Sequence, residues 1–307
     1  MVELPTRHLL DIASLADSSI EKLLRRTAAL AEGAAVTPID RTVANLFFEP
    51  STRTRVSFEL AAQRIGMRAI SIELDRSSST KGETLSDTAA TLAAMGVDCL
   101  VLRHPETGRC HALAGEIGPG LALLNAGDGS GEHPSQALLD AATIARHGPD
   151  WPDLNLSVIG DIRHSRVARS GLALFRRLGA GRLRIAGPPE LLPDSAELPG
   201  VEVCHSLPEA VDGANVIMML RIQRERMDKA GWPDVERYHA DWGLRETVLA
   251  RARPNCLVMH PGPINRGVEI AADVADGPRS LILRQVRMGV FTRMAILEWL
   301  AGGLPAS

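Results

Sequence analysis

Short runs of apolar residues recur along the chain and are separated by longer polar or mixed segments. Seven runs stand out, at residues 43–48, 99–102, 121–125, 156–159, 183–186, 216–220 and 257–259. Several are rich in Val, Ile and Leu without alternation of apolar and polar residues, which is typical of strands buried on both faces. The pattern therefore predicts parallel β-sheets covered on both sides.

Helical patterns lie between these predicted strands. Phe58, Ala61, Ala62 and Ile65 follow one another at i, i+3, i+4 and i+7, so they form a single apolar stripe on a helix. A second helix is predicted over 166–178, where Gly179 and Gly181 would end it. Strands that alternate with helices predict an α/β protein, with a parallel sheet flanked by helices.

Length and local composition predict two domains. A chain of 307 residues has room for about two domains of ~150 residues each. Residues 147–152 contain two prolines and a glycine after a predicted helix, and a new β-α-β pattern begins at Leu154. We expect two doubly wound α/β domains of similar size, over residues 1–148 and 149–286.

The charge balance excludes some classes of partner. The 34 Lys and Arg against 37 Asp and Glu give a net charge of -3, whereas binding to nucleic acid or an anionic membrane requires a basic excess. Lys22, Lys81 and Lys229 are the lysines, and the excess of arginine fits codon bias in a GC-rich genome. No run approaches the ~18 apolar residues of a membrane span.

The cysteines and the N-terminus indicate a compartment. Cys99, Cys110, Cys204 and Cys256 form no C-x-x-C pair and no zinc-like spacing, so we expect buried free thiols. The first ten residues lack the apolar core of a signal peptide. We therefore expect a cytoplasmic protein.

The segment at residues 47–55 combines a strand end, a proline and a helix start with hydroxyl and guanidinium groups. Free backbone N–H groups and the positive end of the helix dipole favour an anion at such a position. Capping needs one hydroxyl, whereas Ser51, Thr52 and Thr54 are interleaved with Arg53 and Arg55. Because a planar guanidinium suits phosphate, the segment predicts a phosphate site.

Three more polar segments follow predicted strands, where open α/β sheets bind ligands. They are 103–105, 125–136 and 260–263. A lone His before a proline is usually a turn residue, but the recurrence of such clusters at strand ends weakens that interpretation. Spacing alone does not identify a reaction.

Together these motifs resemble the aspartate and ornithine carbamoyltransferases. The resemblance is carried, in the family's order, by residues 51–55, 81–85, 133–136, 160–161, 165–167, 221–223 and 260–263. It implies that a carbamoyl group passes from carbamoyl phosphate to an amine. It also implies that a C-terminal helix, 287–307, completes the first domain, so that 1–148 binds carbamoyl phosphate and 149–286 binds the acceptor.

The acceptor implied by the resemblance is L-aspartate. Its two carboxylates require cationic groups such as Arg166 and Arg221, whereas ornithine would require acidic partners for its side-chain amine. The chain has His260-Pro261-Gly262-Pro263 where ornithine enzymes typically carry His-Cys-Leu-Pro, and it lacks their Ser-Met-Gly segment. The expected product is N-carbamoyl-L-aspartate, an intermediate of de novo pyrimidine biosynthesis.

The resemblance also implies roles for individual residues. Carbamoyl phosphate would be bound by Ser51, Thr52, Arg53, Thr54, Ser77, Lys81, Arg103, His133 and Gln136. Aspartate would be bound by Lys81, Arg166, Arg221, Gln223, Gly262 and Pro263. The catalytic groups would be Arg53, Thr54, Lys81, Arg103 and His133. No metal and no cofactor is implied.

Assembly is a further implication. In the family, the loop that matches Ser77 and Lys81 reaches the site of a neighbouring subunit, which implies a homotrimer with shared sites. Taken alone, a loop lysine is more often simply solvated. Residues 260–266 resemble bacterial forms without regulatory chains, some of which assemble with dihydroorotase, so dihydroorotase is an expected partner.

Two alternative functions remain open at this point. The first is a carbamoyltransferase for another amine acceptor such as ornithine. The second is a catalytically silent scaffold paralogue, which would be expected to have lost motif residues.

Overall fold

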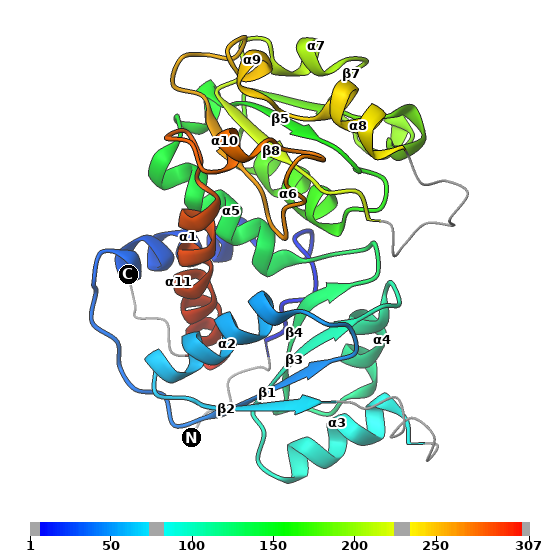
Figure 1. Cartoon of the computed structure of the whole chain (residues 1–307). Coiled ribbons are helices and arrows are strands. Elements are labelled where there is room, and N and C mark those ends of the chain that lie inside the picture. The colour runs from blue at the N-terminus through cyan, green and yellow to red at the C-terminus, as the bar shows by residue number, and fades with distance from the viewer. Residues whose placement is uncertain (1–6, 74–82, 224–233, 303–307) are drawn as a thin grey trace. The chain divides into compact units, whose positions relative to one another are not determined.

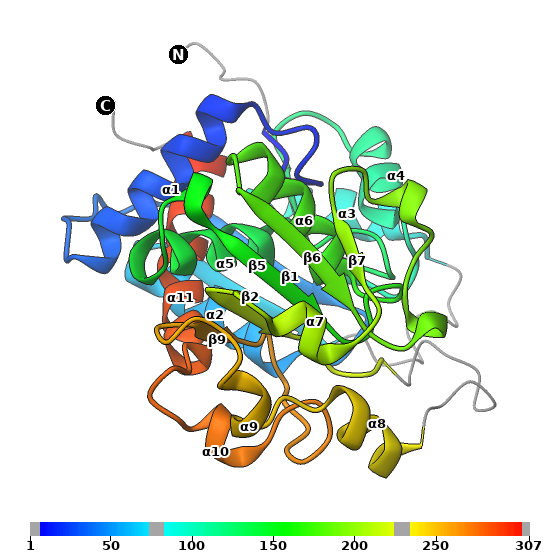
Figure 2. The same cartoon turned by 90° about the horizontal axis from the view of Figure 1, so that it is seen from above.

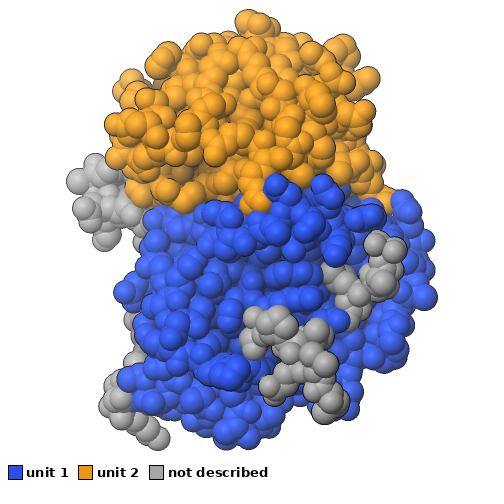
Figure 3. All heavy atoms as spheres, turned by 180° about the vertical axis from the view of Figure 1, so that it is seen from behind, with its two compact units in different colours: residues 1–142, 287–307 blue, residues 143–286 orange. Residues whose placement is uncertain are grey.

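The computed structural model describes residues 7–73, 83–223 and 234–302, and it divides into two compact units. Unit 1 comprises residues 1–142 and 287–307, and unit 2 comprises residues 143–286, as Figure 3 shows by colour. The domain boundary expected between residues 148 and 149 lies near the first of these divisions and stays a prediction.

Unit 1 contains a four-stranded parallel sheet in the order β2-β1-β3-β4 (Figure 1). Its strands are β1 (Thr42–Phe47), β2 (Arg68–Glu73), β3 (Cys99–His104) and β4 (Ala122–Asp128). Its helices are α1 (Asp17–Ala31), α2 (Thr52–Arg64), α3 (Leu85–Ala94) and α4 (Arg109–Glu116), with the larger parts of α5 (Pro134–His147) and α11 (Ile282–Leu300).

Both faces of this sheet are buried. One face contributes Ala44, Leu46, Leu100, Leu102 and Leu123 to a core cluster with residues of α3 and α4. The alternate residues of the same strands, such as Val43 and Val101, are also fully buried. Because neither face meets water, these strands contain almost uninterrupted apolar residues.

Unit 2 contains a five-stranded parallel sheet in the order β7-β6-β5-β8-β9 (Figure 2). Its strands are β5 (Asn155–Ile159), β6 (Arg182–Ala186), β7 (Glu202–Cys204), β8 (Val216–Met219) and β9 (Leu257–Met259). Its α-helices are α6 (Arg166–Arg177), α7 (Leu207–Val211), α8 (Val235–Trp242), α9 (Glu246–Leu249) and α10 (Ala272–Ala275). Short 3-10 helices are η2 (Trp151–Asp153), η3 (Pro189–Leu191) and η4 (Ser195–Glu197).

The predicted fold class, two α/β domains with parallel sheets flanked by helices, is confirmed. Each of the seven apolar runs is a strand, and the predicted helices are α2 and α6. The pattern missed β2 and β7, which are edge strands. In β2, polar residues interrupt the apolar ones, and β7 has only three residues, so neither forms a continuous apolar run.

The four cysteines are free and buried, as predicted. Burial raises the pKa of the Cys99 thiol to about 12, so this thiol stays protonated at neutral pH. Within the described residues, no helix has both the length and the apolar character needed to cross a membrane.

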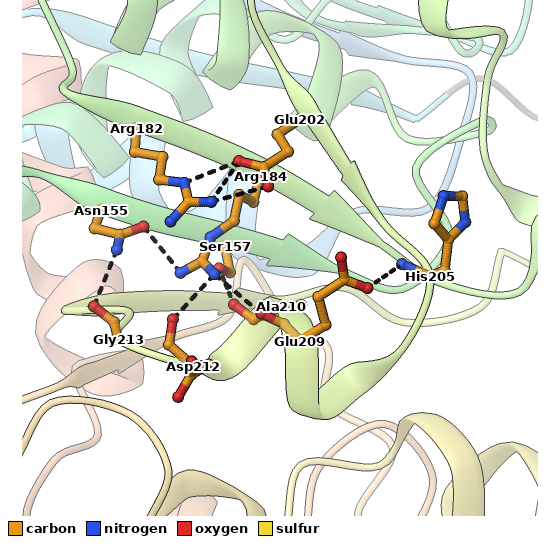
Figure 4. A network of polar contacts seen from close by, with 10 residues as sticks. All are labelled: Asn155, Ser157, Arg182, Arg184, Glu202, His205, Glu209, Ala210, Asp212 and Gly213. Atoms are coloured by element: carbon orange, nitrogen blue, oxygen red, sulfur yellow. Dashed lines mark hydrogen bonds and ion pairs between the residues drawn. The ribbon is translucent and has the colours of Figure 1, made fainter.

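A buried arginine joins the sheet of unit 2 to α7. Arg184 on β6 is only 2% exposed, and its Nη1 donates to the carbonyls of Glu209 and Asp212, both at 3.0 Å (Figure 4). Its Nη2 donates to Oδ1 of Asn155 at 2.9 Å. The last carbonyls of a helix have no partner within the helix, so this guanidinium satisfies the C-terminal end of α7.

Replacing Arg184 by Met is expected to destabilise the protein by about 2–4 kcal/mol, because two carbonyls and an amide oxygen lose their donors and three partly buried hydrogen bonds are removed. Urea denaturation followed by circular dichroism measures the change. Arg182→Met on the same strand is the control, because its ion pair with Glu202 is about half exposed and contributes at most about 1 kcal/mol. Equal effects of the two substitutions would contradict this account of α7.

Candidate functional site

The predicted phosphate segment of unit 1 lies where the strand order of the sheet reverses. The chain passes from β1 to β2 on one side and then returns to β3 on the other side of β1. Ligands of open α/β sheets bind outside the carboxyl ends of the two strands at such a switch point. The segment 48–51 follows β1, and Arg103 is the penultimate residue of β3.

The N-terminus of α2 has the features of an anion site. Ser51 is the N-cap residue, and its side chain makes no capping hydrogen bond to the helix. Its carbonyl accepts from the backbone N–H of Arg55 at 3.0 Å. Thr54 is buried and Arg53 is exposed. Because the Ser51 hydroxyl is not used for capping, this helix start presents hydroxyl, guanidinium and backbone N–H donors to an anion.

Arg103 is held by two neighbouring strand ends. Its Nη2 lies 3.1 Å from a carboxylate oxygen of Glu49, and its Nη1 donates to the carbonyl of Ala126 at 3.1 Å. Its own carbonyl accepts from the N–H of Phe48 at 2.8 Å. The guanidinium is therefore fixed at the carboxyl edge of the sheet before any ligand binds.

His133 and Gln136 begin α5, directly after the segment that follows β4. Both side chains are buried, and a ring nitrogen of His133 lies 3.4 Å from the hydroxyl of Ser135. The unit 1 cluster, defined as residues 49, 51–55, 103, 133 and 136, thus lies at or after the carboxyl ends of β1, β3 and β4. Parallel pairing places these strand ends along one edge of the sheet.

Unit 2 has a second switch point, between β5 and β8. Asp161, two residues after the end of β5, is fully buried and accepts from the backbone N–H of Gln223 at 3.0 Å. It also accepts from the ring Nδ1 of His164 at 2.8 Å. Gly160 has φ +130°, and a Cβ there would lie 2.3 Å from the carbonyl oxygen of Leu220, so only glycine fits between the two strands.

Two arginines lie at this second switch point. Arg166 is the first residue of α6 and is buried, and the hydroxyl of Ser165 caps that helix by accepting from the N–H of Ala168 at 3.2 Å. Arg221 follows β8 and donates to the carbonyl of Ile222 at 3.3 Å. We define the unit 2 cluster as residues 161, 166, 221 and 223. Its guanidinium groups suit carboxylates.

The turn after β9 is held by a buried His–Glu pair. His260 and Glu269 are both fully buried, with 3.1 Å between Nε2 and Oε1. Nδ1 of His260 accepts from the N–H of Gly262 at 2.8 Å, so Nε2 carries the proton and donates to Glu269. The same carboxylate oxygen accepts from the N–H of Asn265 at 2.6 Å. These bonds fix the turn around the cis Gly262–Pro263 peptide.

Burial shifts the pKa of two groups near these clusters and so reinforces the protonation state that each has at neutral pH. It lowers the pKa of His104, next to Arg103, so the ring is neutral at pH 7. Burial also raises the pKa of Tyr238, and the charges of Glu269 and Asp161 raise it further. The phenol is therefore protonated across the physiological range.

Two predicted residues, Ser77 and Lys81, lie outside the described residues. Four acidic residues that lie beside predicted site residues carried no sequence signal that was used: Glu49, Asp140, Asp161 and Glu269. Glu49 lies inside the 47–55 motif and Asp161 inside the 160–161 motif. An acidic residue close to predicted arginines could have indicated that it pairs with them. Nothing in the sequence spacing indicates that Glu269 pairs with His260.

The two switch points define the chain as an α/β protein of two compact units, each with a cluster of polar and cationic groups at the switch point of its parallel sheet. Two family models match this chain: Aspartate/ornithine carbamoyltransferase, carbamoyl-P binding domain, over residues 7–146, and the Asp/Orn binding domain over residues 152–300. The chain belongs to the aspartate/ornithine carbamoyltransferase family.

Individual relatives agree with this assignment. The aspartate carbamoyltransferase catalytic subunit of Methylorubrum populi is 52% identical, over 98% of this chain and 96% of the relative. That of Xanthomonas campestris pv. campestris is 48% identical, over 96% of each chain. Aspartate transcarbamoylase of Trypanosoma cruzi, solved with carbamoyl aspartate and phosphate, is 30% identical with a TM-score of 0.82, over 97% of this chain and 98% of that one.

Replacing Glu269 by Ala is expected to destabilise the protein by about 2–4 kcal/mol, because the His260 ring and the Asn265 amide lose a buried acceptor. Hydrogen exchange is expected to accelerate at the amides of Gly262 and Asn265. Glu246→Ala is the control, because that carboxylate is more than half exposed in its pair with Arg279. Unchanged exchange at both amides would show that the pair does not hold the turn.

Proposed function

We propose that the chain transfers the carbamoyl group of carbamoyl phosphate to the α-amine of L-aspartate, giving N-carbamoyl-L-aspartate and phosphate for pyrimidine biosynthesis. The amine attacks the carbamoyl carbon, and negative charge develops on the carbonyl oxygen of a tetrahedral intermediate. The bond from carbon to the phosphate oxygen then breaks, phosphate leaves with the electron pair, and the nitrogen loses a proton.

The observation that carries this proposal is the set of hydrogen-bond donors and guanidinium groups in the two switch-point clusters. The unit 1 cluster offers a helix N-terminus with an uncommitted cap hydroxyl, which suits the phosphate. The unit 2 cluster offers Arg166 and Arg221, which suit the two carboxylates of aspartate. Trypanosoma cruzi aspartate transcarbamoylase has been solved with carbamoyl phosphate and aspartate, at 29% identity and a TM-score of 0.82.

We assign the residue roles on the same basis. Ser51, Thr52, Arg53 and Thr54 bind the phosphate, and Arg53 stabilises it as it leaves. Thr54, Arg103 and His133 donate to the carbonyl oxygen as its charge develops, and preorganised donors of this kind contribute about 3–4 kcal/mol each. The contact of Arg103 with Glu49 supports such preorganisation.

The acceptor side of the proposal uses unit 2. Arg166 and Arg221 bind the carboxylates, while the N–H of Gln223, which donates to Asp161, fixes the backbone beside Arg221. Gly262 and Pro263 contribute backbone groups from the turn that Glu269 holds. Within this scheme catalysis depends on positioning and electrostatics.

A homotrimer with shared sites is part of the proposal, as are a cytoplasmic location and assembly with dihydroorotase. Exposed apolar side chains on unit 1 support an interface between subunits: Val56 and Leu60 lie one turn apart on α2, and Ile70 lies on edge strand β2. Such a face is typical of a protein–protein contact. Free buried thiols are consistent with a reducing compartment.

Incubation with carbamoyl phosphate and either aspartate or ornithine tests the reaction, with each carbamoylated product measured. We expect carbamoyl-aspartate, and Arg53→Ala is expected to lower kcat at least about 100-fold because the leaving phosphate loses its guanidinium. Arg64→Ala, at the other end of α2, is the matched control and is expected to retain activity.

Each adverse outcome has a distinct meaning. Carbamoyl-ornithine without carbamoyl-aspartate would overturn the acceptor, and full activity of Arg53→Ala would overturn the phosphate site. If the intact chain forms neither product, a silent paralogue would be favoured.

Shared sites predict complementation between two inactive variants. Mixing Lys81→Ala chains with Arg53→Ala chains is expected to restore part of the activity, because some hybrid trimers contain a site without either substitution. Native mass spectrometry confirms that hybrids form. No recovery in confirmed hybrid trimers would mean that Lys81 acts within its own subunit or not at all.

A further inference from the structure

The side-chain amide of Gln136 has a fixed orientation. Its Nε2 donates to Oδ1 of Asp140 at 3.0 Å, one helical turn further along α5. Asp140 is fully buried and Gln136 is 8% exposed. An ionised carboxylate only accepts hydrogen bonds, so the NH2 group of the amide must face Asp140. The carbonyl oxygen of Gln136 is then directed away from Asp140 and is free to accept from another donor.

The positive charge that accompanies Asp140 comes from α11. Arg293 is buried, and its Nη1 donates to the carbonyl of Gly289 at 3.1 Å. Burial lowers the pKa of Arg293 to about 10, while the charge of Asp140 acts in the opposite direction. Arg293 is therefore still protonated at neutral pH, and its positive charge acts on the buried Asp140 carboxylate.

Arg293 also lies next to α2, the helix whose N-terminus is the predicted phosphate site. The guanidinium lies over the ring of Phe58, 5.0 Å from its centroid, and Phe58 belongs to α2, whose first turn carries Arg53 and Thr54. Gly289 leaves the necessary room, because a Cβ there would lie 2.6 Å from Nη1 of Arg293. Three helices of unit 1, α2, α5 and α11, thus meet around one guanidinium.

A carbamoyl group and an acetyl group have nearly the same shape, but only the carbamoyl group carries an NH2 donor. An acceptor fixed opposite this NH2 forms a hydrogen bond with a carbamoyl group and is left unpaired against a methyl group. Sites built around such a bond can reject the analogue that lacks it by large factors. Were the amide free to turn, its NH2 could face the ligand instead, and this discrimination would fall.

We propose that Asp140, supported by Arg293, is a positioning residue that holds the carbonyl oxygen of Gln136 toward the carbamoyl NH2 and so makes the site select carbamoyl over acetyl phosphate. This inference rests on the proposed carbamoyl transfer and on the placement of Gln136 beside the carbamoyl group. It adds two residues, Asp140 and Arg293, and a basis for substrate selection.

Asp140→Asn tests the inference with little change of shape. The new amide can donate or accept, so Gln136 can adopt either orientation. We expect kcat/KM for carbamoyl phosphate to fall about 10- to 100-fold, while the inhibition constant of acetyl phosphate, measured against carbamoyl phosphate, changes less than about threefold. The KM for aspartate is expected to stay near that of the unchanged chain.

A double substitution separates positioning from a structural effect. If Asp140 acts through Gln136, Asp140→Asn is expected to have no further effect on kcat/KM in a Gln136→Ala background. An equal loss in both backgrounds, or an unchanged preference for carbamoyl over acetyl phosphate in Asp140→Asn, would overturn the proposal.

Arg293→Met is a second variant that keeps the proposal testable if Asp140→Asn fails to fold. Its apolar chain can still pack on Phe58 but supplies no charge, and it is expected to lower the same preference. An unchanged preference in this variant would also overturn the proposal. Failure of the intact chain to carbamoylate aspartate would instead reject the proposed function, so the two failures are distinguishable.

Discussion

The reversal of strand order within each parallel sheet is the constraint on which the functional arrangement depends. At the β1/β3 junction of unit 1 and the β5/β8 junction of unit 2, adjacent strands send their connections to opposite sides. The carboxyl ends of those strands are therefore left open for side chains and ligands. The chain segments approach closely there, because a Cβ on Gly160 would collide with the backbone carbonyl of Leu220.

Carboxylates that are buried or partly buried hold three of the proposed ligand-binding groups in place. Glu49 contacts Arg103, Asp161 accepts from the backbone of Gln223, and Asp140 accepts from Gln136. An acceptor already in place removes the reorganisation that binding would otherwise require.

Much of the fold was predictable because its strands are buried on both faces. Continuous apolar runs identified seven of the nine strands in the described residues, and the stripe from Phe58 to Ile65 identified α2. β2 was not predicted because polar residues interrupt its apolar residues, and β7 was not predicted because three residues are too few to form a pattern. The candidate residues of the unit 1 switch point were identified by chemical type and by their position after strands, whereas those of the unit 2 switch point came from the family resemblance. Their assignment to one reaction came from a family resemblance.

The sequence by itself determined the fold class, the polar groups at the strand ends and the anionic nature of the ligands, because these follow from local order and side-chain chemistry. Only the tertiary structure decided which side chains contact and orient one another. Glu269 is nine positions from His260, and Arg293 is more than 230 from Phe58, yet packing places each pair together. Such contacts depend on how strands and helices pack in three dimensions, so they cannot be predicted from the spacing of residues along the chain.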